Sequence, residues 1–172
     1  MSNPLTKEWR QHYVKRLTSM GLEQLGNGFC ANVFQHPTMP TIAVKVVEAT
    51  DKQFFRYMKW AKEHPWNPWV PQFYDSQLID VVNERGYGII FLERLERISE
   101  TEYVEFMTEQ LCCTSSRVSA DSLREAEAKC HSDDLRSLIH FLLVSAKSLD
   151  LHQGNFLKRG QQIVFVDPVA GP

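Results

Sequence analysis

Three oxygen-bearing side chains near the end of the sequence constrain its fold more than any other feature. In the stretch S-L-D-L-H-Q-G-N-F-L-K-R-G-Q-Q-I-V-F-V-D-P-V, Asp150 is followed five residues later by Asn155, and Asp167 comes after a predicted hairpin. Residues 156–157 and 163–166 predict its two short strands, and folding them back brings Asp167 beside Asn155. The spacing suits an acidic base and two ligands that hold Mg²⁺ against a nucleotide's phosphates. A polar loop followed by a buried hairpin is the alternative, so a second feature is needed.

A glycine-containing segment in the first quarter of the chain supplies that feature. Gly26-Asn27-Gly28 and Val33 fit the G-x-G-x-x-G-x-V loop that covers phosphates in protein kinases, with Ala31 in the third glycine's place. Glycines let backbone N–H groups approach phosphate oxygens that a Cβ would hold away. Residues 42–45 (I-A-V-K) match the kinase V-A-I-K strand, whose lysine is here Lys45. In this chain order, the two regions together predict a kinase-like protein that binds ATP and Mg²⁺.

Four motifs resemble one family in particular. They are the L-G-N-G loop, the H-P-x-x-P segment of His36–Pro40, the D-L-H-Q-G-N box, and D-P-V in place of D-F-G. From about Leu22 to Val169 the chain resembles the early host-takeover serine/threonine protein kinases of T-seven-like bacteriophages, least clearly in the middle. The resemblance implies transfer of the ATP γ-phosphate to host bacterial proteins in the host cytoplasm, with transcription shut-off as the purpose. The D-x-H-x-G-N box is also similar to those of aminoglycoside phosphotransferases and atypical kinases.

The resemblance also implies roles for individual residues. Asp150 would orient the attacking hydroxyl and accept its proton, and Lys45 would bind the α- and β-phosphates. Asn155 and Asp167 would hold Mg²⁺, while Gly26-Asn27-Gly28 would cover the phosphates of ATP in a cleft.

Residues 89–95, I-I-F-L-E-R-L, resemble the fifth strand and interlobe hinge of a kinase. By that resemblance the Glu93 carbonyl and the Leu95 N–H would bond the adenine. The alternative is an ordinary strand end with exposed charges.

Composition limits the partners and the compartment. The chain has 172 residues, 43% of them hydrophobic and 23% charged, with a net charge of −2 and a pI near 6.3, so a nucleic-acid partner is not expected. We expect no membrane span and find no signal-peptide core at the N-terminus. Four cysteines show no framework spacing. Cys112-Cys113 with Cys130-His131 lack the C-x-x-C knuckle of a metal site, which favours free, mostly buried thiols.

Hydrophobic periodicity predicts an α+β fold, and the resemblance implies a minimal bilobal kinase-like domain spanning residues 1–172. Residues from about 1 to 95 would form an N-lobe with a leading helix, a small antiparallel sheet and the hinge. Residues from about 96 to 172 would form a truncated helical C-lobe. The first predicted element is a helix to Met20, ended by Gly21, with the apolar stripe Trp9, Tyr13, Leu17 and Met20. Three strands follow over 22–47, and then a helix over 51–64 that buries Phe54, Phe55, Met58 and Ala61. Strands 73–82 and 87–92, joined by a turn at Asn83–Gly86, precede helices 101–113 and 121–129 and a third helix from Ser132 that leads into Asp150.

Two departures from the kinase pattern keep other functions open. The helix over 51–64 offers only Glu63, with Glu48 and Asp51 before it, as partners for Lys45. Only four residues follow Pro168 in this sequence, where a typical protein kinase would continue with an activation segment and substrate-binding helices. A catalytically silent module that binds and inhibits a host protein is therefore one rival, and a small-molecule phosphotransferase is another.

Three smaller features carry expectations of their own. Residues 114–119 form a polar loop that is a plausible phosphoacceptor site or simply solvated. For His152 we expect a structural role, with the imidazole bonded to backbone, rather than a role as ligand or acid–base group. Pro168 fixes φ and lacks the mobile aromatic ring of D-F-G, so we expect a permanently set metal site.

Overall fold

The computed structural model describes residues 4–28, 31–82, 85–113 and 118–170. The protein is α+β, and it divides into two compact units, residues 1–49 with 74–94 and residues 50–73 with 95–172. Among the helices in the described ranges, none has both the length and the apolar character that crossing a bilayer requires.

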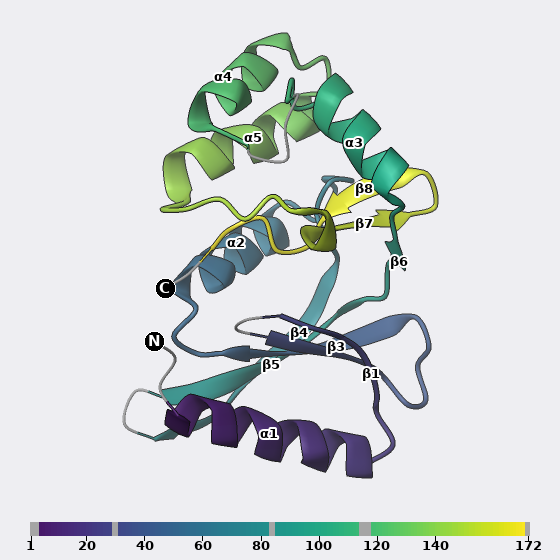
Figure 1. The fold of residues 1–172 in the computed structure, drawn as a ribbon, viewed down its shortest axis with the longest axis vertical. Helices are drawn as coiled ribbons and strands as arrows, with labels where there is room; N and C mark the ends of the chain where they lie inside the picture. The colour runs from purple at the N-terminus through teal and green to yellow at the C-terminus, as the bar shows by residue number, and fades with distance from the viewer. Residues whose placement is uncertain (1–3, 29–30, 83–84, 114–117, 171–172) are drawn as a thin grey trace. The chain divides into compact units, whose positions relative to one another are not determined.

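The first unit is a sheet with one helix beside it (Figure 1). Its strands follow the order β1-β2-β3-β5-β4, and β1 with β2, β2 with β3, and β3 with β5 pair antiparallel. The elements are α1 (Pro4–Ser19), β1 (Glu23–Asn27), β2 (Ala31–Gln35), β3 (Ile42–Glu48), β4 (Phe73–Val82) and β5 (Arg85–Glu93).

The two faces of this sheet have different roles. One face packs against α1 through a buried cluster of Tyr13, Leu17, Leu22, Phe34, Val44, Val46 and Tyr87. Val33, Lys45 and Ile90 stand opposite one another in the register of β2, β3 and β5, so they share the other face. The predicted phosphate-binding lysine is therefore on the face that α1 does not cover.

The second unit combines helices with a small sheet of order β6-β7-β8 (Figure 1). Phe106, Phe156 and Phe165 meet in its core, with ring centroids 4.7 Å apart for Phe156 and Phe165 and 5.7 Å apart for Phe106 and Phe165. Helices α4 and α5 lie side by side. The elements are α2 (Lys52–Glu63), β6 (Glu96–Arg97), α3 (Glu100–Glu109), α4 (Ala120–Lys129), α5 (Asp133–Ser145), the 3₁₀ turn η1 (Gln153–Asn155), β7 (Phe156–Arg159) and β8 (Gln162–Phe165).

Side-chain caps determine where the helices of this unit begin. The Asp51 carboxylate accepts the Phe54 N–H at the start of α2. Ser99 and Glu102 form a reciprocal capping box at the start of α3. Such caps satisfy N–H groups that a helix leaves unpaired. The helices therefore begin within a residue or two of the positions that the sequence predicted.

Several predicted details change in the structure. Gly21 ends α1 as predicted, with φ of +86°, but Met20 lies beyond the helix and is 62% exposed rather than part of the apolar stripe. The predicted helix over 101–113 is too long, because α3 ends at Glu109 and Cys112 takes a left-handed φ of +53°. Residues 50–73, which the sequence assigned to the N-lobe, group with the second unit.

The predicted buried face of α2 is also partly wrong. Phe55 is half-buried, whereas Gln53 and Tyr57 are buried beside the expected Phe54, Met58 and Ala61. A helical repeat of 3.6 residues brings position 57 onto the face of 54 and 61, and turns position 55 away from it.

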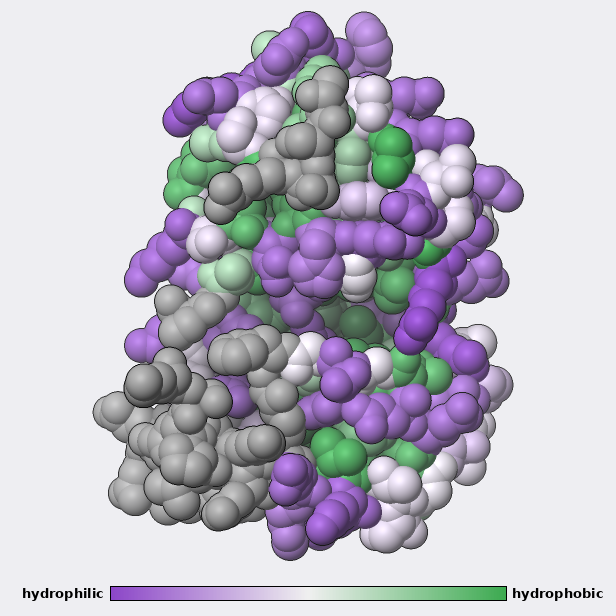
Figure 2. Space-filling view, viewed as in Figure 1, coloured by the Kyte–Doolittle hydropathy of each residue, from purple (hydrophilic) through white to green (hydrophobic). Residues whose placement is uncertain are grey.

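The face seen in Figure 2 is mostly polar. Hydrophilic side chains cover most of its coloured surface, and apolar side chains appear in small groups. Among the described residues, the large apolar ones that are exposed are Met20, Met39, Trp66, Tyr74, Val104 and Val144. Single apolar side chains of this kind are usual on a protein surface and do not by themselves mark an interface.

Candidate functional site

Backbone hydrogen bonds bring the three predicted site residues of the second unit into one region. The Asp150 N–H donates to the Pro168 carbonyl over 3.0 Å, and the Val166 N–H donates to the Asn155 carbonyl over 2.9 Å. Leu149 forms an antiparallel bridge with Val169. The segment that carries Asp167 is therefore tied at both ends to the loop that carries Asp150 and Asn155, as the folded-back hairpin predicted.

The hairpin between them is held by its apolar residues and by its turn. Phe156 pairs with Phe165 in the ladder of β7 and β8, and both side chains are fully buried. Gly160 takes a φ of +61° in the two-residue turn, a conformation that glycine adopts without steric cost. Toward this turn, β7 extends two residues and β8 one residue further than the sequence predicted.

Asn155 is buried, and its amide orientation is set by the loop. The Nδ2 group donates to the Asp150 carbonyl over 2.7 Å. This bond turns Oδ1, the oxygen that would coordinate a cation, to the opposite edge of the amide. An amide oxygen together with the Asp167 carboxylate is a suitable donor set for Mg²⁺, which binds few protein oxygens and keeps several waters. The residues present therefore fit the predicted ion.

Tyr57 of α2 joins this region although the sequence did not single it out. Its side chain is fully buried, and its hydroxyl donates to the carbonyl of Phe165, two residues before Asp167. Burial, and then the nearby charge of Asp167, raise the pKa of the Tyr57 hydroxyl well above its usual value. A buried tyrosine hydroxyl needs an acceptor, and the Phe165 carbonyl is that acceptor here.

The imidazole of His152 bonds to the backbone, as the sequence predicted. Its Nδ1 accepts the Gly154 N–H over 3.0 Å, so the imidazole caps η1 by bonding to backbone. The Asn155 N–H donates to the His152 carbonyl over 2.9 Å, which closes the same turn.

The predicted phosphate-covering segment is a hairpin in the first unit. Gly26 pairs with Val33 and Asn27 with Asn32, and the Gly28 N–H donates to the Ala31 carbonyl over 2.8 Å. Neither glycine has a positive φ. A Cβ built on Gly26 meets no atom within 4 Å, and one on Gly28 makes only an ordinary contact of 3.7 Å. Internal packing of the described residues therefore does not explain why glycine stands at either position.

Lys45 is 5% exposed in the middle of β3. A lysine ammonium is seldom buried to this extent unless oxygens surround it. The buried side chains of α2 include no carboxylate, and Glu63 at its end is exposed. The helix glutamate that pairs with this lysine in kinases thus has no counterpart on that buried face.

The predicted hinge residues lie at the end of the first unit and the start of the second. Glu93 is the last residue of β5, half-buried and paired with Ile42. Leu95, also half-buried, begins the second stretch of the second unit. The adenine-binding roles of Glu93 and Leu95 remain predictions.

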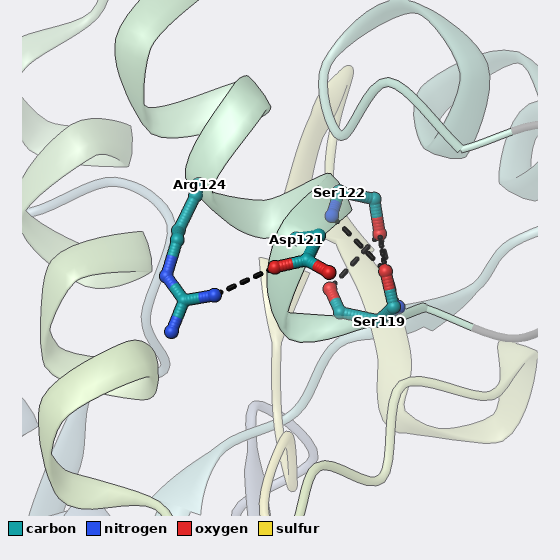
Figure 3. Close-up of polar contacts among 4 residues, drawn as sticks. All are labelled: Ser119, Asp121, Ser122 and Arg124. Carbon is teal, nitrogen blue, oxygen red and sulfur yellow. Dashed lines mark hydrogen bonds and ion pairs between the residues drawn. The ribbon is translucent and has the colours of Figure 1, made fainter.

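The polar loop before α4 is only partly described, since residues 114–117 lie outside the described ranges. Figure 3 shows its last residue, Ser119, at the start of α4. The Ser119 Oγ accepts the Ser122 N–H over 3.1 Å, while the Ser119 N–H donates to the Ser122 Oγ over 2.9 Å. Asp121 bonds to Arg124 over 2.6 Å beside them. The Ser119 hydroxyl therefore acts as a helix cap in this structure.

Comparison with known proteins adds no family to this picture. No protein-family model matches the chain, and no curated protein matches it either.

Cys112, Cys113 and Cys130 are free thiols, and the described residues contain no cluster of three or more His, Cys, Asp or Glu side chains placed to hold a metal ion.

Proposed function

We propose that the chain is an ATP-dependent serine/threonine protein kinase of the bacteriophage type, acting on host bacterial proteins. The observation that carries the proposal is the backbone pairing of the Asp150–Asn155 loop with the segment that contains Asp167. It gathers one possible proton acceptor and two possible Mg²⁺ ligands in a single unit. A polar loop without catalytic function does not require this combination of side chains.

In this proposal the substrate hydroxyl oxygen attacks the γ-phosphorus of ATP. The bond from that phosphorus to the β–γ bridging oxygen breaks, ADP leaves with the electron pair, and the hydroxyl proton passes to the Asp150 carboxylate. Mg²⁺, when bound by Asn155 and Asp167, would neutralise charge on the phosphate oxygens. Asp150 therefore acts mainly by orienting the hydroxyl, and catalysis comes from positioning and charge neutralisation.

The glycines of β1 give independent support. A glycine inside a strand costs about 0.5–1 kcal/mol relative to alanine. At Gly26 the φ is not positive and a Cβ would meet no atom of the described residues within 4 Å, although the pairing of β1 with β2 is irregular between Gln24 and Gly26. Open space beside the backbone is what a phosphate would need, and Lys45 supplies a cation for the same ligand.

Nucleotide binding is the first test. Millimolar Mg²⁺-ATP should raise the melting temperature of the wild-type protein, since a ligand that binds only the folded state stabilises it. Gly26→Val should weaken the shift by placing a branched side chain in the open space, and Lys45→Ala should remove most of it. Thr38→Ala on an exposed turn is the matched control and should keep the full shift. An unmoved melting curve for the wild type would contradict the proposal.

Phosphoryl transfer is the second test. Asp150→Asn is nearly isosteric and should keep folding and the ATP-induced shift, while transfer of radiolabelled phosphate to proteins of a bacterial lysate should fall by about 10²–10⁴-fold.

A silent binding module is the second candidate, because the buried face of α2 carries no carboxylate of the kind that pairs with the strand lysine in kinases. It predicts that Asp150→Asn and Lys45→Ala leave inhibition of the host unchanged. If transfer is absent and inhibition survives both changes, the binding module replaces the kinase.

A further inference from the structure

The imidazole of His152 lies beside the proposed proton acceptor. Its Nδ1 accepts the Gly154 N–H over 3.0 Å. A ring nitrogen that accepts a hydrogen bond carries no proton, so the proton of the neutral ring is on Nε2. That Nε2 lies 3.7 Å from Oδ1 of Asp150. The ring therefore places an N–H donor near the carboxylate, at a separation longer than a hydrogen bond.

Gly154 provides the space that the imidazole occupies. A Cβ at this position would lie 2.8 Å from Cε1 and 3.1 Å from Nδ1 of His152. The first distance is shorter than side chains tolerate, so any residue other than glycine would move the ring. The φ of Gly154 is outside the positive range, so the backbone conformation does not itself require glycine. The glycine is thus explained by the position of the His152 ring.

The carboxylate of Asp150 needs such a neighbour. Its main chain is fixed, because its N–H bonds to Pro168 and its carbonyl accepts from Asn155. Its side chain, however, is 45% exposed, and a partly exposed aspartate has several rotamers of similar energy. A donor held on one side favours the rotamers that place a carboxylate oxygen near it.

We propose that His152 is a positioning residue, whose Nε2–H holds the Asp150 carboxylate in the rotamer that receives the substrate's proton. The catalytic consequence rests on the proposed kinase function, whereas the orientation of the ring does not. His152 itself does not touch the reacting atoms in this account. It acts through Asp150, and Gly154 acts through His152.

Two substitutions separate this role from the capping of η1. His152→Asn places an oxygen near the position of Nδ1, so it keeps the cap but loses the donor that faces Asp150. His152→Gln reaches the position of Nε2 with an amide N–H but cannot cap the turn in the same way. Gly154→Ala keeps the histidine and displaces its ring. His152→Asn thus removes the donor, His152→Gln removes the cap, and Gly154→Ala removes the alignment of the ring with Asp150.

The expected results differ from those of a purely structural role. In His152→Asn, kcat should fall about tenfold or more, because the hydroxyl and its acceptor lose their alignment, while the melting temperature and the KM for ATP stay near wild type. His152→Gln should lower the melting temperature yet keep more of kcat. Gly154→Ala should resemble His152→Asn in kcat. A His152→Asn variant with wild-type kcat would overturn the inference, as would variants whose kcat simply follows their melting temperature.

A measurement without substrate tests the geometry directly. Long-range ¹H–¹⁵N NMR at pH 8 distinguishes the two neutral tautomers of the His152 ring. We expect the proton on Nε2 in the wild type and a mixture of tautomers in Gly154→Ala, because the bond to Nδ1 is then disturbed. A wild-type ring protonated on Nδ1 refutes the inference whatever the enzyme does. An Nε2–H ring in a protein that transfers no phosphate refutes the kinase function instead, and the catalytic role of His152 with it.

Discussion

Tyr57→Phe provides a sharp test of the contact between α2 and the strand that leads to Asp167. The substitution removes one hydroxyl and keeps the ring, which is tilted against Phe141 with centroids 6.2 Å apart and edge-on to Phe73 at 6.5 Å. No large cavity forms, so the change isolates the hydrogen bond to the Phe165 carbonyl.

The size of the effect at neutral pH follows from burial. A net hydrogen bond contributes about 0.5–1.5 kcal/mol, and leaving a buried acceptor with one bond fewer adds to the loss. We expect Tyr57→Phe to lower the free energy of unfolding by about 1–2 kcal/mol at pH 7. For a chain of this size that corresponds to a melting temperature lower by roughly 2–8 °C.

At high pH the sign of the difference should change. The pKa of Tyr57 is raised in the folded protein by burial first and then by Asp167, so the folded state keeps a proton that the unfolded state loses above its pKa of about 10. The stabilisation is complete below pH 10 and is lost as the pH rises from 10 toward the folded-state pKa, by about 1.4 kcal/mol per pH unit. Phenylalanine has no such loss. The variant's deficit should therefore vanish about one pH unit above 10.

Urea unfolding followed by tryptophan fluorescence from pH 7 to pH 11.5 measures this crossover. Tyr74→Phe is the control, because Tyr74 is 53% exposed and its hydroxyl reaches water. It should change little at any pH. A Tyr57→Phe deficit that stays constant or grows above pH 10 would refute the reasoning, since it would mean that the hydroxyl titrates alike in both states.

Two further predictions concern α3. Cys112→Gly should raise the free energy of unfolding by up to about 1 kcal/mol in urea, because glycine adopts the φ of +53° without strain, and a clear loss would contradict this. Glu102 has its pKa lowered to about 2 by its hydrogen bond to Lys158 and by its cap at Ser99, so its stabilising contribution is present above pH 4.5 and lost as the pH falls from 4.5 toward 2. Glu102→Gln should remove that part of the acid-induced loss, seen by circular dichroism, and an unchanged acid transition would count against the pair.

Local chemistry made part of this fold predictable. Gly21 marks the end of α1, and the alternation in 156–166 marks a hairpin, because each depends on residues close together in sequence. The contacts that shape the candidate site are of another kind. The hydrogen bond from Asp150 to Pro168 joins residues 18 positions apart, and the one from Tyr57 to Phe165 joins residues 108 positions apart. No pattern in either segment specifies the other, so the sequence could place Asp167 near Asn155 but could not find Tyr57.

The grouping of α2 explains the departure from the kinase pattern that the sequence left unresolved. Phe54 of α2 packs edge-on against Phe73, and Tyr57 lies against Phe141, so the buried face of α2 forms part of the core of the second unit. An unpaired carboxylate on that face would cost several kcal/mol, because it would be transferred from water to aromatic surroundings. The absence of a glutamate there thus follows from packing and does not by itself indicate that activity was lost. The paired substitutions Lys45→Ala and Asp150→Asn test the proposed kinase function itself, the first through ATP binding and the second through phosphoryl transfer.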